Sequence, residues 1–215
     1  MLARLYFEYK KRRSVQRWNR RGRPVPVPSA VKRDILLDYA RRFNLRSFVE
    51  TGTLKGDTVF ALRHAFDQLW TVEIEPRLVA RAQARFAGDP GVRCLEGDSA
   101  VVLPGIVRSL TQPTLFWLDG HYMGPGAGDP TNPCPISTEL ECVLAVREHA
   151  HVILIDDARL FTGADNYPPL DTLRQTIAAQ RPDLEWSVEQ DIIRLVPGAR
   201  GAAGGMATGK ATSGI

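Results

Sequence analysis

FVETGTLKGDT, residues 48–58, carries more structural information than any other part of the chain. A short apolar run ends in Glu50, two glycines follow four residues apart at Gly52 and Gly56, and Asp57 offers a side chain able to cap a helix. A strand, a glycine turn and a helix start in this order are typical of α/β proteins. The arrangement brings the backbone close to a nucleoside-bearing ligand.

A second predicted strand adds a carboxylate that suits a ribose. The run LWTVEI, residues 69–74, contains Glu73, which lies 23 residues after Glu50. In dinucleotide-binding folds an acid at this place accepts hydrogen bonds from ribose hydroxyls. The glycine spacing, however, is not GxGxxG and lacks the third glycine that lets a backbone approach a pyrophosphate. These residues favour a nucleoside ligand without a diphosphate, with S-adenosylmethionine as the candidate cofactor.

Apolar, strand-like runs alternate with helical patterns along the rest of the chain. TLFWL, residues 114–118, is almost continuously apolar, as central parallel strands are. The last two runs, 184–188 and 191–196, are separated by two residues, so they must pair antiparallel. We therefore expect an α/β, Rossmann-like fold: a doubly wound, mostly parallel seven-stranded sheet with an antiparallel C-terminal hairpin. The other strands are expected at about 46–50, 69–74, 92–96 and 152–156, and the helices at about 31–43, 56–66, 76–87, 99–109, 136–149 and 169–180.

Charge and composition divide the chain into three parts. Residues 1–23 hold nine Lys or Arg against one acid, a net +8, whereas the whole chain carries +4. PVPVP, residues 24–28, predicts a stiff connector, and the end of the chain is rich in glycine with almost nothing to bury. We expect a basic arm and connector over 1–28, a folded domain over 29–197 and a disordered tail over 198–215.

The sequence of the basic arm does not identify what the arm binds. Nucleic acid and an anionic membrane surface both suit its charge, but no nucleic-acid motif accompanies the charge, so nucleic acid is the least favoured partner. Four residues, Leu2, Leu5, Tyr6 and Tyr9, lie at helical spacing. The plainer interpretation is a helix that packs this apolar face onto its own domain.

The sequence also predicts the surroundings in which the protein works. No apolar run reaches the length of a membrane span, and the first residues lack a secretory signal. Three cysteines, Cys94, Cys134 and Cys142, show no CxxC spacing, which disfavours a zinc site. We expect a soluble, cytoplasmic protein with reduced thiols.

Acidic residues follow every predicted parallel strand. Carboxyl ends of parallel strands meet at one edge of a sheet, and clustered carboxylates repel unless a cation or hydrogen-bond donors hold them. Asp119, Asp156 and Asp157 follow adjacent strands and offer the hard oxygen ligands of Mg²⁺ or Mn²⁺. Asp98 suits helix capping as well as ligand contact, and Asp156 could instead cap a neighbouring loop. The full set is Glu50, Glu73, Asp98, Asp119 and the pair Asp156 and Asp157.

The span from Phe48 to Val196 resembles class I S-adenosylmethionine-dependent methyltransferases. Within that class it is similar to the metal-dependent O-methyltransferases of the catechol and macrocin types. The first-turn pattern Glu-x-Gly-x-x-x-Gly-x-Ser of the catechol type is matched, with Thr for Ser, by Glu50, Gly52, Gly56 and Thr58. Further matches are the ribose-binding Glu73 before Ile74, Glu75 and Pro76, the first metal-binding aspartate at Asp119, and the Asp-Asp pair at Asp156 and Asp157.

This resemblance implies a donor, a metal and a set of site residues. The implied donor is S-adenosylmethionine and the implied metal is Mg²⁺ or Mn²⁺. The implied metal ligands are Asp119, Asp156 and Asp157. The implied cofactor-binding residues are Glu50, Gly52, Thr53, Gly56, Thr58, Glu73, Asp98 and Ser99.

The catalytic base is where the chain departs from the catechol type. The lysine that follows the first metal-binding aspartate there has no counterpart, since His121 and Tyr122 occupy that stretch. His121, with Asp119 beside it, is the candidate catalytic base, although a loop histidine without a catalytic role suits the position as well. The Gly- and Pro-rich segment 123–134 could act as a lid over the site.

The expected function is an O-methyltransferase that acts on a hydroxyl of a sugar or small secondary metabolite. Two other classes remain: a non-catalytic nucleoside-binding module with a basic membrane- or partner-binding arm, and an NAD-dependent oxidoreductase. The strand-end aspartates disfavour the first, while the missing third glycine and the hairpin disfavour the second. The sequence does not identify the acceptor or the oligomeric state.

Overall fold

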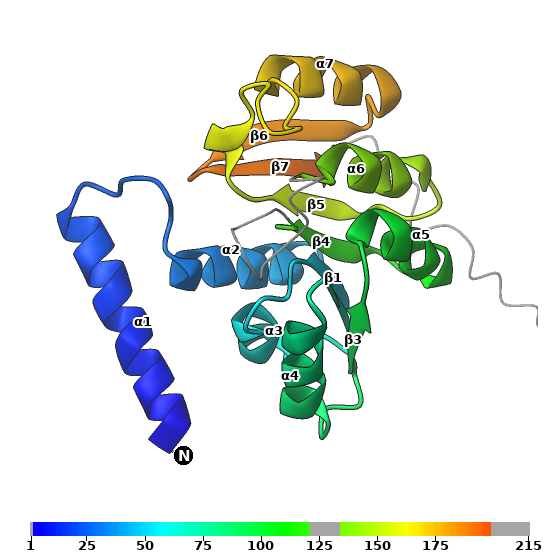
Figure 1. The fold of residues 1–215 in the computed structure, drawn as a ribbon. Coiled ribbons are helices and arrows are strands. Elements are labelled where there is room, and N and C mark those ends of the chain that lie inside the picture. Colours follow the sequence, from blue (N-terminus) through cyan, green and yellow to red (C-terminus); the bar gives the residue numbers. More distant parts are fainter. Residues whose placement is uncertain (1, 121–133, 199–215) are drawn as a thin grey trace, which may run out of the picture.

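A seven-stranded sheet runs through the computed structural model, which describes residues 2–120 and 134–198 (Figure 1). The strand order is β3-β2-β1-β4-β5-β7-β6. Strands β1 to β5 pair in parallel, and β7 pairs antiparallel with both β5 and β6. The predicted sheet with its C-terminal hairpin is therefore confirmed. The strands are Ser47–Thr51 (β1), Gln68–Glu73 (β2), Val92–Glu96 (β3), Thr114–Leu118 (β4), Val152–Ile155 (β5), Leu184–Glu189 (β6) and Ile192–Pro197 (β7).

The central strands form because their apolar runs are covered on both faces. Every residue of β1, β4 and β5 is buried. Strand β1 lies between β2 and β4, with Thr51 level with Val72 on one side and Leu118 on the other. The carboxyl ends of these three strands therefore meet at one edge of the sheet, and each end carries or precedes a predicted site residue.

Helices cover both faces of the sheet and build two cores with it. On one face the helices α5, α6 and α7 supply buried apolar side chains, and on the other face α2, α3 and α4 do so. Leucine, valine and phenylalanine side chains of alternate strand positions meet these helices from each side. The helices are Ser29–Arg42 (α2), Asp57–Leu62 (α3), Pro76–Phe86 (α4), Ser99–Ser109 (α5), Ile136–Ala145 (α6) and Leu170–Gln180 (α7).

Helix α6 ends four residues before the predicted boundary at 149 because a distant side chain takes over its last carbonyls. The Arg181 guanidinium Nη1 donates to the backbone oxygens of Leu144 and Val146, each at 3.0 Å. Terminal carbonyls need such partners, and a cation at a helix C-terminus is favourable. Helix α3 is likewise shorter than the predicted 56–66.

The basic arm forms helix α1, Leu2–Arg20, which stands apart from the layers of the sheet (Figure 1). Its C-terminal end is anchored by Trp18, whose Nε1 donates to the backbone oxygen of Pro24 at 2.7 Å. Tyr9 of the expected apolar face is 55% exposed, whereas the side chains of Leu2, Leu5 and Tyr6 lie outside the described part. Contact of the arm with a membrane or another partner stays a prediction. None of the described helices combines the length and the apolar character that crossing a membrane requires.

Candidate active site at the carboxyl ends of the strands

The turn after β1 passes directly against the end of β4. Gly52 has a φ of +84°, and its N–H donates to the backbone oxygen of Val72 at 2.9 Å. A Cβ atom at Gly52 would lie 2.5 Å from the backbone oxygen of Asp119. Only glycine fits this conformation and this spacing. Gly56 ends the turn as the residue before α3, with a φ of +70°.

Glu73, at the end of β2, is held by backbone donors. Its Oε2 accepts from the N–H of Leu54 at 2.7 Å, and its Oε1 accepts from Ile74 at 3.0 Å and Glu75 at 3.1 Å. The carboxylate is therefore fixed between the first turn and the start of the next loop. Three of the four lone-pair sites of the carboxylate are thus in use, and the remaining one, on Oε2, can accept from a ribose hydroxyl. Its predicted role in binding the cofactor stays a prediction.

Glu50 lies beneath the turn and is bound to the threonines around it. The carboxylate is buried, with Oε2 accepting from Thr71 Oγ1 at 2.7 Å, and Thr58 also donates to it. Thr71 Oγ1 lies 2.5 Å from Thr53 Oγ1. Burial raises the pKa of Glu50 to about 8, although the threonine hydrogen bonds lower it. In this structure Glu50, Thr53 and Thr58 thus organise the turn from inside.

Asp98 and Ser99 begin helix α5. Asp98 Oδ1 accepts from the N–H of Ala100 at 2.9 Å, so the helix-capping interpretation of Asp98 is the one seen. Ser99 is buried and donates from its hydroxyl to Glu139 of α6. Contact of either residue with a cofactor stays a prediction.

Asp119, Asp156 and Asp157 meet in one acid cluster. Each offers a carboxylate oxygen, and these oxygens all lie within 4.8 Å of one another. Consecutive side chains of an extended strand point to opposite faces. Asp157 instead has a left-handed backbone with a φ of +56°, and its N–H donates to Asp156 Oδ1 at 2.8 Å. Both neighbouring carboxylates thereby join Asp119, so Asp156 is part of the cluster.

Repulsion and burial make this cluster costly without a cation. Burial and then the charge of Asp156 raise the pKa of Asp119 well above its ordinary value. Burial also raises the pKa of Asp156 to about 6, although Lys32 lowers it. Ionised carboxylates in such surroundings need a positive partner.

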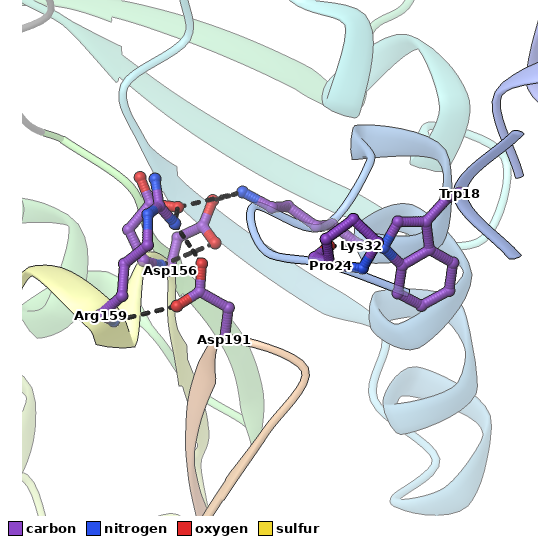
Figure 2. A network of polar contacts seen from close by, with 7 residues as sticks. Trp18, Pro24, Lys32, Asp156, Arg159 and Asp191 are labelled. Atoms are coloured by element: carbon purple, nitrogen blue, oxygen red, sulfur yellow. Dashed lines mark hydrogen bonds and ion pairs between the residues drawn. The ribbon is translucent and has the colours of Figure 1, made fainter. Parts of the chain in front are cut away.

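Lys32 of helix α2 supplies one such partner (Figure 2). Its Nζ forms an ion pair with Asp156 Oδ2 and lies 3.3 Å from Asp157 Oδ1. Burial lowers the pKa of Lys32, but Asp156 and Asp157 outweigh burial, so the pKa lies above its ordinary value. The ammonium group is therefore charged at neutral pH.

A second cation connects the cluster to the C-terminal hairpin. Arg159 Nη1 lies 2.8 Å from Asp157 Oδ1 and also pairs with Asp191 Oδ2 in the turn between β6 and β7 (Figure 2). The backbone N–H of Arg159 donates to Asp191 Oδ1 at 2.9 Å. The hairpin therefore helps to set the position of Asp157.

The donors of the cluster fit a hard divalent cation. Three carboxylates converge, and Glu139 lines the same small cavity as Asp119 and Asp156. Glu139 is 1% exposed, burial raises its pKa to about 7, and its Oε1 has no hydrogen-bond partner among the described residues. An unsatisfied buried carboxylate oxygen is costly. A cation or a ligand donor in this cavity would satisfy it.

Sequence reasoning missed Lys32, Arg159 and Glu139. Lys32 and Glu139 lie on predicted helices, and nothing local points from either residue to the strand ends. Arg159 follows the Asp-Asp pair by two residues, and this closeness is the signal that could have found it. His121, Tyr122 and residues 123–133 of the predicted lid lie outside the described residues, so the choice of catalytic base stays a prediction.

Searches by sequence found no related family: no protein-family model matches the chain, and no curated protein sequence matches it. Comparison of the structure with solved structures finds many similar folds. A candidate caffeoyl-CoA O-methyltransferase from Staphylococcus aureus is 13% identical, with a TM-score of 0.60, over 92% of this chain and 100% of that one.

Two further neighbours contain a bound cofactor or its product. The O-methyltransferase TomG from Streptomyces achromogenes, solved with S-adenosylmethionine, is 21% identical with a TM-score of 0.54, over 87% of this chain and 89% of that one. An O-methyltransferase from Bacillus cereus, solved with S-adenosylhomocysteine, is 17% identical with a TM-score of 0.55, over 86% of this chain and 90% of that one. The chain therefore has the class I methyltransferase fold.

Proposed function

We propose that this protein transfers a methyl group from S-adenosylmethionine to a hydroxyl oxygen of a small molecule, with a divalent metal ion at Asp119, Asp156 and Asp157. The observation that carries this proposal is the contact between the first turn and the end of β4. Because a Cβ at Gly52 would collide with the backbone oxygen of Asp119, the predicted cofactor turn and the acid cluster are immediate neighbours.

The donor side of the site is built to orient an adenosyl group. Glu73 is held by three backbone N–H groups and would accept from a ribose hydroxyl through the remaining lone pair of Oε2. The first turn lies between Glu73 and the end of β4, and neighbours with this fold bind S-adenosylmethionine or S-adenosylhomocysteine. Fixing the donor in this way contributes to the rate by holding the sulfonium methyl in line with the acceptor.

The acceptor side is the acid cluster. A divalent ion held by Asp119, Asp156 and Asp157 would supply a Lewis acid that lowers the pKa of the acceptor hydroxyl. The chain contributes the position of the three carboxylates through the left-handed Asp157 and the Arg159 contact. We keep His121 as the proposed base that removes the hydroxyl proton.

A sugar or small secondary metabolite is the proposed class of acceptor. TomG, one of the structural neighbours, is involved in tomaymycin synthesis, which concerns a small molecule. This support is an analogy of fold, since one fold serves many substrates.

The two competing functions account for less of the structure. A non-catalytic nucleoside-binding module has no use for three converging aspartates. An NAD-dependent oxidoreductase needs a pyrophosphate site, but the first turn lacks the third glycine, and the sheet ends in the antiparallel pair β6 and β7.

Transfer of radiolabelled methyl from S-adenosylmethionine to a panel of hydroxylated sugars and phenols tests the proposal. We expect transfer that stops in a chelator and returns with excess Mg²⁺ or Mn²⁺, because the acceptor is activated at the acid cluster. Full transfer in the chelator would remove the metal from the mechanism. Absence of transfer together with absence of S-adenosylhomocysteine binding would contradict the proposed function as a whole.

A further inference from the structure

The acid cluster already holds a cation that the chain itself provides. Lys32 Nζ contacts Asp156 Oδ2 and approaches Asp157 Oδ1 to 3.3 Å (Figure 2). These oxygens belong to two of the three aspartates that converge as candidate metal ligands. A metal ion and the ammonium group therefore address the same carboxylates.

The fold holds Lys32 in this place. Lys32 lies in the first turn of α2, and the buried side chains of Leu36 and Tyr39 fix that helix against the sheet. The Lys32 side chain is 15% exposed, so little water screens its contact with the aspartates. The 124 residues that separate Lys32 from Asp156 show that the pair depends on the assembled fold.

The negative charges of the acid cluster are not balanced even with Lys32 present. Asp119, Asp156, Asp157 and Asp191 bring four negative charges when ionised, and Lys32 with Arg159 brings two positive ones. Two negative charges remain, which equals the charge of one divalent ion. Glu139 lines the same cavity as Asp119 and Asp156, and its buried Oε1 has no hydrogen-bond partner within residues 2–120 and 134–198, which independently points to a missing positive or donating group.

A divalent metal ion and the Lys32 ammonium group cannot both stay in full contact with the carboxylates of Asp156 and Asp157. Mg²⁺ binds carboxylate oxygens at about 2.1 Å and demands near-octahedral geometry, so it needs the lone pairs that the ammonium now uses. An ammonium group at hydrogen-bond distance from the same oxygens would also repel the ion.

We propose that Lys32 competes with the divalent metal ion for Asp156 and Asp157, and so sets how tightly the site holds metal. This inference rests on the proposed function, because it takes the acid cluster as the metal site. Metal binding then displaces the Lys32 ammonium from the two aspartates, and Lys32 acts as a positioning residue that keeps the cluster assembled until the ion arrives.

Titration of Mn²⁺ followed by electron paramagnetic resonance tests the competition on the purified full chain. Lys32→Gln keeps much of the side-chain length and removes the charge, so we expect it to bind Mn²⁺ roughly ten- to a hundredfold more tightly than the unchanged chain. Arg41→Gln removes one positive charge from an exposed position of the same helix and should change the affinity by less than about twofold. Lys32→Arg keeps the charge and should stay near the unchanged chain. Equal or weaker Mn²⁺ binding by Lys32→Gln would overturn the proposal.

A second measurement needs no substitution. If Mn²⁺ displaces Lys32, saturating Mn²⁺ should raise the acetylation rate of Lys32 by acetic anhydride several-fold in the unchanged chain, as read by mass spectrometry, while exposed Lys55 reacts at a constant rate. A rate at Lys32 that does not respond to Mn²⁺ would contradict the displacement.

The outcomes also separate this inference from the proposed function. If no chain binds Mn²⁺ but S-adenosylhomocysteine still binds, the competition is overturned and the methyltransferase proposal survives without its metal. If S-adenosylhomocysteine does not bind either, the proposed function itself fails.

Discussion

Asp119→Asn should lower the rate of methyl transfer by roughly a hundredfold or more while it leaves the affinity for S-adenosylhomocysteine within about threefold. The substitution keeps the shape of the side chain but removes its negative charge. Asp119 lies in the acid cluster with Asp156 and Asp157, and a neutral amide there would bind a divalent ion poorly. The cofactor turn contacts Asp119 through its backbone oxygen, which the substitution leaves in place.

Initial rates of radiolabelled transfer at saturating S-adenosylmethionine measure this effect, and calorimetry measures the binding of S-adenosylhomocysteine. Asp38→Asn is the matched control, because Asp38 is an exposed aspartate on α2 whose neutralisation should leave both quantities unchanged. An Asp119→Asn variant with the rate of the unchanged chain would show that the acid cluster takes no part in the reaction.

Glu73→Ala should weaken the binding of S-adenosylhomocysteine by roughly ten- to a hundredfold. A hydrogen bond from a ribose hydroxyl to a carboxylate is worth about 1.5–3 kcal/mol, which corresponds to about that range. The substitution also frees the N–H groups of Leu54, Ile74 and Glu75, so the first turn should loosen. Calorimetric titration gives the affinity, and thermal unfolding shows whether the fold persists.

Two further variants separate ribose binding from turn stability. Glu73→Gln can still accept from the N–H groups of Ile74 and Glu75 through its amide oxygen, but its amide nitrogen takes the place of Oε2, which accepts from Leu54 and would accept from the ribose. It should therefore bind more weakly, with a smaller loss of thermal stability than Glu73→Ala. Glu96→Ala is the control, because Glu96 is exposed and lies level with Glu73 on strand β3. Unchanged S-adenosylhomocysteine affinity in folded Glu73→Ala would place the ribose elsewhere.

The sheet could be predicted from the sequence because the patterns that specify its strands lie within short stretches of the chain. The buried run of β4 is apolar at nearly every position, and the two residues between the last runs leave an antiparallel hairpin as the only connection. Because strand and helix alternate, the acids that follow the strands could also be placed at one edge of the sheet. The meeting of Asp119 with Asp156 and Asp157 could be predicted in the same way, because β4 and β5 are adjacent.

What the sequence could not show depends on contacts between distant parts of the chain. The end of α6 is set by Arg181, which follows α7 and reaches back to Leu144 and Val146. The counter-charge of the cluster comes from Lys32, on a helix that precedes the first strand. A local sequence pattern indicates helix or strand propensity and apolar periodicity. It cannot indicate an ion pair between Lys32 and Asp156, which lie 124 positions apart in the sequence.

Glu50 illustrates the same limit within the predicted site. The motif predicts an acid that binds the cofactor, but the structure surrounds its carboxylate with Thr58 and Thr71. Thr71 lies beside Glu50 because β1 and β2 pair in register, which places the two residues level with each other, whereas Thr58 comes from helix α3. Direct contact of Glu50 with the cofactor stays a prediction.

Diffraction from crystals grown with S-adenosylhomocysteine and Mn²⁺ tests the account most directly, with data collected at the manganese absorption edge. We predict an anomalous peak among the carboxylates of Asp119, Asp156 and Asp157, with a ribose hydroxyl on Glu73 and the Lys32 ammonium moved off Asp156 and Asp157. Density for the adenosyl group away from the first turn, or no anomalous peak at the three aspartates, would contradict it.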